Sequence, residues 1–269
     1  MNVLGIETSC DETSAAVVSN GKDILSNITV SSLNLHKKYN GIIPEIAFRR
    51  QLETITQVTE EAIRKSRIKI KALDLISVTA NPGLLGSLLV GLTFAKAVSL
   101  SYNIRCIEVD HLYAHIYSAL LGQKKPVFPF IALVISGGHT SLFKIDSFEK
   151  FNLIGSTLDD ACGEAFDKVS KILGLGYPGG PIVERMARYG KPSIRFNCCD
   201  TNKKFDFSFS GIKTAVLYYV NNLRSKQSGN LSKTQIYDIC ASFQKSVAEA
   251  LIKKSFLACS EKRSKLLIV

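Results

Sequence analysis

Val3-Leu-Gly-Ile6 is a short apolar run that leads directly into a polar turn, Glu7-Thr-Ser-Cys-Asp-Glu-Thr13, with further apolar residues after it. The same order returns in the second half of the chain. There Phe130-Ile-Ala-Leu-Val-Ile135 leads into Ser136-Gly-Gly-His-Thr140, and Leu142-Phe-Lys-Ile145 follows. Short apolar runs on both sides of a polar turn are typical of β-hairpins. The sequence therefore predicts two related halves, each opening as strand, turn, strand.

Strands and helices alternate after each opening. Pro44 favours a helix start, and apolar residues recur at three- and four-residue spacing from Phe48 to Ala62, which predicts an amphipathic helix. Short apolar runs predict further strands over residues 75–79, 105–109 and 266–269. Further helices are predicted over residues 85–101, 158–173, 211–224 and 233–260, and another helix is predicted to start near residue 182. This alternation predicts an α/β fold. We divide it into a first lobe over residues 1–125 and a second lobe over residues 126–269.

Composition limits the class of protein. The 269 residues are 46% hydrophobic and 21% charged, and the net charge is +11. A basic excess favours a polyanionic partner such as nucleic acid, although a generally lysine-rich surface explains it equally well. The seven cysteines include no Cys-x-x-Cys pair, which is typical of reduced thiols in the cytosol. No signal peptide is visible, and the most apolar helix candidate, residues 84–100, is short and interrupted by Lys96. We therefore expect a cytoplasmic protein without a membrane segment.

The clearest candidate for chemistry is the pair His111 and His115, which follows a predicted strand. Residues four apart lie on one face of a helix, close enough for two imidazoles to bind one metal ion. The alternative is a capping histidine followed by a packed one. Leu112 stands where a zinc peptidase has the glutamate that serves as general base, so the pattern does not favour a peptidase.

Three turns could bind an anion or a metal. In Ser136-Gly-Gly-His-Thr140 and Tyr177-Pro-Gly-Gly-Pro181, glycines let backbone N–H groups approach a phosphate closely. The second of these turns precedes an expected helix, whose dipole favours anions at its N-terminus. The hydroxyls and carboxylates of residues 8–12 could likewise handle phosphate or metal. Ordinary hairpin turns and a rigid connector explain the same residues.

Three further features each have two interpretations. Asp167 could hydrogen-bond a ligand hydroxyl, whereas Glu164 and Lys168 on the same predicted helix form an ordinary surface ion pair. Phe207-Ser-Phe-Ser-Gly-Ile-Lys213 could stack on a base, or its phenylalanines could belong to the core. Residues 185–204 hold six basic residues against one acid, which fits either a phosphate-binding patch or a solvated face.

Six motifs, taken in order, resemble the tRNA N6-adenosine threonylcarbamoyltransferase family (TsaD, formerly Gcp, the O-sialoglycoprotein endopeptidase-like group). They are Gly5-Ile-Glu-Thr-Ser-Cys-Asp-Glu-Thr13, His111-x-x-x-His115, Ser136-Gly-Gly-His-Thr140, Asp160-Ala-x-Gly-Glu-Ala-Phe-Asp-Lys168, Tyr177-Pro-Gly-Gly-Pro181 and Phe207-Ser-Phe-Ser-Gly-Ile-Lys-Thr214. The resemblance implies an actin-like ATPase (ASKHA) fold, with a nucleotide in a cleft between two ribonuclease H-like lobes. It also implies a reaction, the transfer of a threonylcarbamoyl group from threonylcarbamoyl-AMP to N6 of adenosine 37 in tRNAs that read codons beginning with A.

The resemblance further implies the site and the partners. His111 and His115 bind one divalent metal per subunit, usually iron(II). Contacts to threonylcarbamoyl-AMP come from Val134, Ile135, Ser136, Gly137, Gly138, Asp167, Gly180 and Glu184. The family often has Asp where this chain has Glu184. Asp11 is our candidate for an acid/base or orienting role. Implied partners are tRNA, a paralogous actin-fold subunit and a small ATPase of the bacterial complex.

One departure from the family pattern opens an alternative. After a strand such as Leu266–Val269, family members continue into a Gly-Gly-Val-x-x-Asn segment and a helix whose aspartate is the third metal ligand, and these 269 residues contain neither. Two histidines hold a metal less well than two histidines and a carboxylate. If these residues are the whole protein and not a fragment, we expect weak metal binding and poor or no activity. The alternatives are an inactive scaffold member of the modification complex, an actin-fold kinase or ATPase that leaves the histidine pair unexplained, and a peptidase, against which Leu112 counts.

Overall fold

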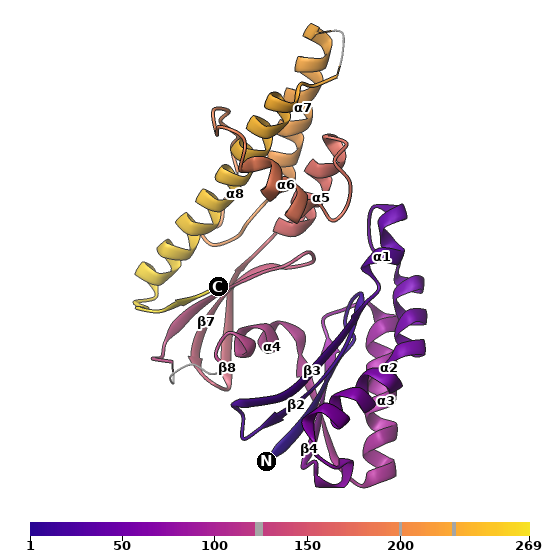
Figure 1. Cartoon of the computed structure of the whole chain (residues 1–269). Helices are drawn as coiled ribbons and strands as arrows, with labels where there is room; N and C mark the ends of the chain where they lie inside the picture. Colours follow the sequence, from indigo (N-terminus) through magenta and orange to yellow (C-terminus); the bar gives the residue numbers. More distant parts are fainter. Residues whose placement is uncertain (122–125, 199–200, 228–229) are drawn as a thin grey trace. The chain divides into compact units, whose positions relative to one another are not determined.

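The opening stretch forms the predicted hairpin in the computed structural model (Figure 1), which describes residues 1–121, 126–198, 201–227 and 230–269. Strand β1 (Asn2–Glu7) pairs antiparallel with β2 (Glu12–Ser19) across the polar turn. The chain forms two units, residues 1–124 and 125–269. Because residues 122–125 lie outside the described part, the boundary that we place after residue 125 stays a prediction.

The first unit is a five-stranded sheet in the order β3-β2-β1-β4-β5. The added strands are β3 (Asp23–Ser31), β4 (Leu75–Asn81) and β5 (Arg105–Asp110). Strands β4 and β5 run parallel to β1, as buried strands joined by helices do. The sequence did not predict β3, because this edge strand is largely exposed and carries several polar residues, so it lacks a clear alternation.

Helices cover both faces of this sheet. On one face lie α2 (Pro44–Ser66) and α3 (Leu85–Tyr102), which pack side by side, and near the other lies α4 (His111–Ser118). Short helices, α1 (Leu33–His36), η1 (Lys37–Tyr39) and η2 (Ile70–Ala72), connect the larger elements. Alternate residues of β1 follow this division, since Leu4 and Ile6 enter the core with α2, while Gly5 and Glu7 point to the opposite face.

Helix α3 ends at Tyr102, one residue beyond the predicted range of residues 85–101. Its 18 residues are apolar enough, by length and composition, to cross a membrane. A single helix of this kind is a weak indication, because helices that cover a sheet pass the same test. In the first unit α3 packs on α2 and β4, and Val90 and Ala95 are buried there.

The second unit repeats the first unit's opening. Strands β6 (Phe130–Ile135), β7 (Thr140–Ser147) and β8 (Lys150–Ser156) form an antiparallel meander, and β9 (Leu267–Ile268) pairs parallel with β6. The resulting order, β8-β7-β6-β9, matches the order β3-β2-β1-β4 of the first unit. The expectation of two related halves is therefore confirmed.

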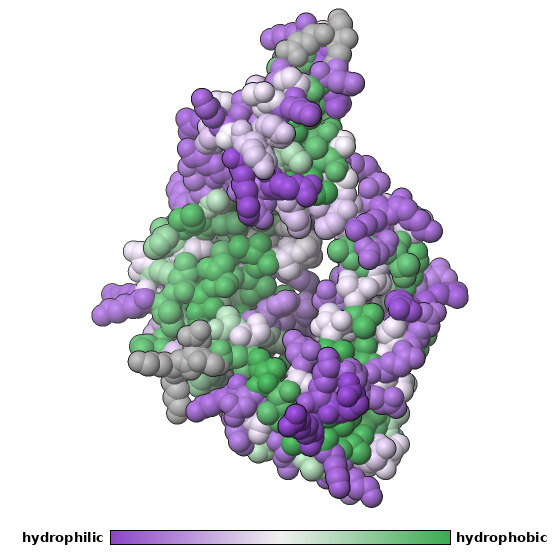
Figure 2. Space-filling view, viewed as in Figure 1, coloured by the Kyte–Doolittle hydropathy of each residue, from purple (hydrophilic) through white to green (hydrophobic). Residues whose placement is uncertain are grey.

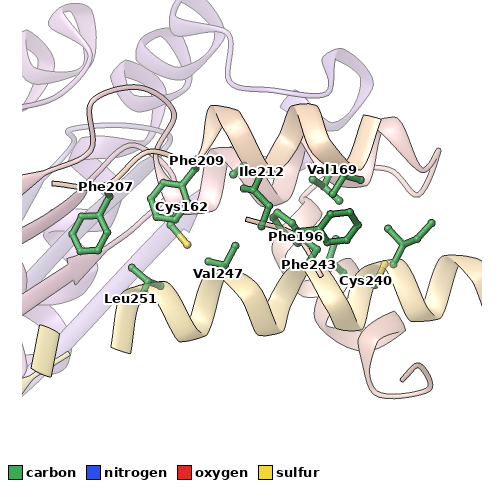
Figure 3. Close-up of a cluster of buried hydrophobic side chains, with 14 of the residues drawn as sticks. Cys162, Val169, Phe196, Phe207, Phe209, Ile212, Cys240, Phe243, Val247 and Leu251 are labelled. Atoms are coloured by element: carbon green, nitrogen blue, oxygen red, sulfur yellow. The ribbon is translucent and has the colours of Figure 1, made fainter. Parts of the chain in front are cut away.

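Four helices accompany the second sheet: α5 (Cys162–Ile172), α6 (Gly179–Ala187), α7 (Ser210–Gln227) and α8 (Lys233–Glu261). Figure 3 shows their apolar side chains meeting, with Val247 and Phe243 of α8 facing Ile212 of α7 and Val169 of α5. Ser232 begins α8 with a capping box, accepting the Gln235 N–H while the Gln235 side chain accepts the N–H of Ser232.

Two predicted helix starts were wrong. Helix α5 begins at Cys162 rather than Leu158, because the backbone N–H of Leu158 donates to Phe207 in a strand-like contact. Helix α6 begins at Gly179 rather than near residue 182. There the Asp167 carboxylate accepts the first N–H of α6, an interaction between two helices that sequence periodicity does not reveal.

Candidate metal and nucleotide site

Two histidines of the first unit meet as the sequence predicts. Strand β5 ends at Asp110, whose carboxylate accepts the backbone N–H groups of Leu112 and Tyr113 and so begins α4. His111 and His115 then lie on one face of α4. Their Nε2 atoms are 3.1 Å apart, and the rings are nearly perpendicular, at 78°.

This spacing fits two neighbouring ligands of one metal ion. A histidine nitrogen binds zinc at about 2.0–2.1 Å, so two adjacent ligands of one ion have nitrogens about 3.0–3.4 Å apart. The Nε2 separation falls in that range. Within the described residues, however, no group of three His, Cys, Asp or Glu side chains could hold a metal. Among the described residues, the first unit thus offers two imidazole nitrogens at a spacing that one metal ion could bridge.

Glu7 and Ser9 contact the ring of His111 at Nδ1, the nitrogen that faces away from His115. Its Nδ1 lies 3.2 Å from Glu7 Oε2 and 3.2 Å from Ser9 Oγ. Burial by itself would raise the pKa of Glu7, but hydrogen bonds from His111, Ser9 and Thr79 lower it to about 2. A carboxylate on the second nitrogen of a metal-binding histidine fixes its tautomer and orientation. Nε2 of His111 is therefore the nitrogen available to a metal.

The turn that contains Glu7 and Ser9 is a candidate site from the sequence, but no local pattern connects either residue with His111 or points to Thr79. The signal was present in the order of the strands. Glu7 ends β1, Thr79 lies near the end of β4, and His111 follows β5. These three strands are parallel neighbours, so their carboxyl ends meet at one edge of the sheet, where ligands bind in α/β folds.

A cavity of about 350 Å³ adjoins the histidine pair within the first unit. Its walls include Gly5 and Ala16 from the hairpin, Ser77 from β4 and Ala114 from α4. Small side chains on the sheet leave this space open. The cavity therefore places room for a small ligand directly beside the imidazoles.

Asp11 lies in the same polar turn but is not among the residues that line this cavity. Its backbone carbonyl accepts both the N–H and the hydroxyl of Ser32. Gln51 of α2 also stabilises the turn, because its side-chain nitrogen lies 3.0–3.3 Å from the carbonyl oxygens of Thr8, Cys10 and Glu12. These hydrogen bonds fix the backbone at Asp11. The chemical role of the Asp11 side chain stays a prediction.

In the second unit, the glycine-rich turn lies against the start of α5. Val134 is buried at the end of β6 and Ile135 is half-exposed. The Ser136 hydroxyl accepts the N–H groups of Gly138 and His139. A Cβ at position 163 would lie 2.8 Å from the Cα of Gly137, so only glycine there allows this approach. The expected contact residues 134–138 therefore meet a helix N-terminus.

Asp167 joins this region to α6. Its Oδ1 accepts the Gly179 N–H at 2.6 Å, and burial raises the pKa of its carboxyl group. Gly179 packs directly on the backbone of Asp167, and Gly180 follows in the first turn of α6. Glu184, one turn later, pairs with Arg188 at 2.6 Å on the exposed surface. The structure brings the turn, α5 and the start of α6 together, with Asp167 as a structural link.

One open alternative from the sequence is decided, and a second stays open. Phe207 and Phe209 are fully buried and belong to the core, so neither is available to stack on a base. The expected basic patch over residues 185–204 is partly neutralised, because Arg188 pairs with Glu184 and Lys204 pairs with Glu261. The acid of that stretch, Asp200, lies outside the described residues.

Sequence comparisons identify relatives along nearly the whole chain. The family model described as TsaD, tRNA N6-adenosine threonylcarbamoyltransferase, matches residues 23–269. A protein of that name from Syntrophotalea carbinolica is 47% identical over 97% of this chain and 75% of its own length. A second, from Dictyoglomus turgidum, is 45% identical over 100% of this chain and 79% of its own length.

Structural comparison shows the fold. Component A of the (R)-2-hydroxyglutaryl-CoA dehydratase of Acidaminococcus fermentans matches 99% of this chain and 81% of its own, with a TM-score of 0.53 at 15% identity. It has the actin-like ATPase fold, which is the fold class expected from the sequence.

Proposed function

This chain belongs to the tRNA N6-adenosine threonylcarbamoyltransferase family, and from that membership we propose that it transfers the threonylcarbamoyl group of threonylcarbamoyl-AMP to N6 of adenosine 37 in tRNAs that read codons beginning with A. Membership of this family by itself identifies the chain as a transferase of tRNA modification. The geometric observation that supports the proposal is the 3.1 Å approach of His111 and His115 beside a cavity, because the two imidazole nitrogens could hold one metal ion there.

In the proposed reaction, a bond forms between the adenine nitrogen and the carbamoyl carbon. The bond between that carbon and a phosphate oxygen breaks, and AMP leaves with its electron pair. A divalent metal, iron(II) in our proposal, would supply Lewis-acid stabilisation of the charge that develops on the acyl oxygen. The chain's own contribution is to orient the histidines. Glu7 and Ser9 hold His111 through Nδ1, so its Nε2 faces His115.

The nitrogen of adenine must lose a proton as the new bond forms. We assign to Asp11 the role of orienting or accepting that proton, since its turn is held by Ser32 and Gln51. The phosphate of the departing AMP would bind the backbone N–H groups of Gly137 and of Gly180, which lies in the first turn of α6, where the helix dipole favours an anion. Glu184 would hydrogen-bond a ribose hydroxyl after leaving its surface pair with Arg188.

The partners and the compartment belong to the same proposal. We assign tRNA and threonylcarbamoyl-AMP as substrates, a paralogous actin-fold subunit and a small ATPase as partners, and the cytoplasm as the location. The net charge of +11 supports a polyanionic substrate.

The test is transfer of labelled threonylcarbamoyl from its adenylate to unmodified tRNA, with the partner proteins and iron(II) supplied. We expect His111→Ala and His115→Ala each to lower the rate at least about 100-fold, because Lewis-acid stabilisation contributes several kcal/mol. Glu108→Gln, a surface change on β5, serves as the control. An Asp11→Ala variant with full activity would remove Asp11 from the mechanism, and an iron-loaded chain without any transfer would overturn the proposal.

One observation favours a second candidate, a scaffold member of the modification complex. The described residues contain no third side chain near His111 and His115 that completes a metal group. A scaffold would bind the partner proteins but retain less than stoichiometric iron. Measuring bound iron on the purified 269-residue chain separates the two candidates, since stoichiometric iron together with normal transfer rules out the scaffold.

A further inference from the structure

The C-terminal end of α8 and the segment after it carry cations without acidic partners. Across the described residues, five Lys and Arg side chains of this region make no ion pair; they are Lys253, Lys254, Lys262, Arg263 and Lys265. On the left of Figure 2, a hydrophilic group projects from this side of the second unit next to a broad hydrophobic area. Basic residues nearby do find acids, as Lys204 does with Glu261 at 2.9 Å. Within the described residues, the second unit thus keeps a basic surface here whose cations make no ion pair.

A hollow of about 270 Å³ lies in this surface, between α8 and the segment around Thr201. Lys204, Lys253 and Lys254 contribute to its walls, together with Leu257. The Lys254 ammonium donates to Thr201 Oγ1 at 3.0 Å and to the Lys204 carbonyl at 3.3 Å. Both acceptors are neutral. They fix the position of the ammonium group without cancelling its charge.

An ammonium group held in this way favours an anion with several acceptor oxygens. Phosphate has this chemistry, and a lysine binds it as a point charge. The surface also extends beyond one phosphate, because Lys254 and Lys262 are eight residues apart, about 12 Å along a helix. A row of cations of this length suits a chain of phosphates better than one small ion.

We propose that this surface, defined by Lys253, Lys254, Lys262, Arg263 and Lys265, binds backbone phosphates of the tRNA substrate. The proposal rests on the proposed function and adds the place where the second unit holds the nucleic acid. It replaces the patch over residues 185–204, part of which is paired with acids. Contacts to phosphates carry no base information, so this surface would position tRNA without selecting its anticodon.

The test compares a double variant, Lys253→Gln/Lys254→Gln, with a control that removes the same charge elsewhere, Lys22→Gln/Lys71→Gln. Both control lysines are exposed in the first unit and outside the proposed site. Equilibrium binding of unmodified tRNA is followed by fluorescence anisotropy over a range of KCl concentrations. We expect the double variant to bind about tenfold more weakly, and the slope of log K against log salt to fall by roughly 1.5–2 for two lost phosphate contacts. The loss should be equal for tRNAs with different anticodons.

A second double variant separates loss of charge from local unfolding. Lys254 hydrogen-bonds Thr201 and Lys204, so its replacement could also disturb the structure there. Lys253→Gln/Lys265→Gln changes two exposed side chains and leaves Lys254 in place, and we expect the same loss. If both double variants bind tRNA with the affinity and salt slope of the control, this surface is only solvated and the proposal is overturned, while the proposed function stands. If the unaltered chain neither binds nor modifies tRNA, the proposed function itself fails.

Discussion

The imidazole of His111 shows how one side chain is given a chemical role by its neighbours. Glu7 approaches Nδ1 at 3.2 Å, and Thr79 donates to the same carboxylate oxygen at 2.5 Å. With a pKa of about 2, Glu7 carries a negative charge at neutral pH. That charge favours the tautomer with its proton on Nδ1 and leaves the Nε2 lone pair facing His115.

Glu7→Gln should therefore weaken metal binding. The amide keeps the size of the side chain but removes the charge behind His111, and we expect the affinity for Co²⁺ or Zn²⁺ to fall about 10- to 100-fold. A competition titration with a chromophoric chelator measures this. Glu108→Gln, on the strand that leads to His111, should leave the affinity unchanged, and equal affinities for both variants would contradict the orienting role of Glu7.

Gln51 holds the polar turn from the core side. It is buried, and its side-chain nitrogen contacts three backbone carbonyl oxygens while its own Oε1 has no hydrogen-bond partner in the structure. Gln51→Leu would leave those carbonyls short of a donor, and we expect a loss of about 1–3 kcal/mol in the free energy of unfolding. Urea denaturation followed by circular dichroism measures it.

Gln57→Leu is the matched control for that change, since Gln57 is exposed on the same helix. We expect its unfolding midpoint to stay within about 0.5 kcal/mol of the unaltered chain. Equal midpoints for the two variants would mean that the turn over residues 8–12 does not depend on Gln51.

Asp160, which lies two residues before α5, connects helices α5 and α7 through ion pairs. Asp160 pairs with Lys168 of α5 and with Lys213 of α7 at 3.2 Å. Burial alone would raise the pKa of Asp160, but the hydrogen bonds and charges of the two lysines lower it below its ordinary value. One carboxylate thus connects two helices of the second unit.

This lowered pKa makes stability depend on pH in a defined direction. A group with a depressed pKa in the folded state stabilises the fold above its unfolded pKa, and this stabilisation is lost as the pH falls. Asp160→Asn should cost about 1–2 kcal/mol at pH 7, and the difference should shrink between about pH 5 and about pH 3. Thermal melts at several pH values measure it.

The comparison for Asp160 is Glu249→Gln, which breaks an exposed pair with Lys245 on α8. Exposed pairs of this kind contribute little, so this variant should match the unaltered chain at every pH. A constant difference for Asp160→Asn across the whole pH range would show that its charge is not the cause.

At the scale of the whole molecule, each unit has its own apolar core. The first core lies between the five-stranded sheet and α2 and α3, and the second is built around α8, α7 and α5. Phe243 is fully buried at the centre of the second core and contacts Phe166 edge-on, with ring centroids 4.8 Å apart.

Phe243→Ala should therefore destabilise the second unit by about 3–5 kcal/mol. Hydrogen exchange followed by mass spectrometry should show faster exchange in α7, α8 and β6, with little change in β1 and β4. The reciprocal variant, Ile76→Ala in the core of the first unit, should show the opposite pattern. Equal acceleration in both units by either variant would mean that they unfold as one cooperative body.

The sequence could predict the repeated elements because their signals are local. A hairpin turn between apolar runs, a proline at a helix start and a four-residue histidine spacing depend only on near neighbours. These signals predicted both openings, most of the long helices and the histidine pair. They did not predict β3 or the starts of α5 and α6, because contacts with Phe207 and Asp167 set those two starts.

The α/β class, the repeat and the shared helix face of His111 and His115 follow from local signals in the sequence. The surroundings of His111 depend on the fold, since Glu7, Thr79 and His111 are more than 30 residues apart from one another in the chain and meet only because β1, β4 and β5 are parallel neighbours. The same holds for charge. Composition shows that the chain is basic, but only the fold shows which cations lack an acid beside them, because ion pairing depends on distance in space and not along the chain.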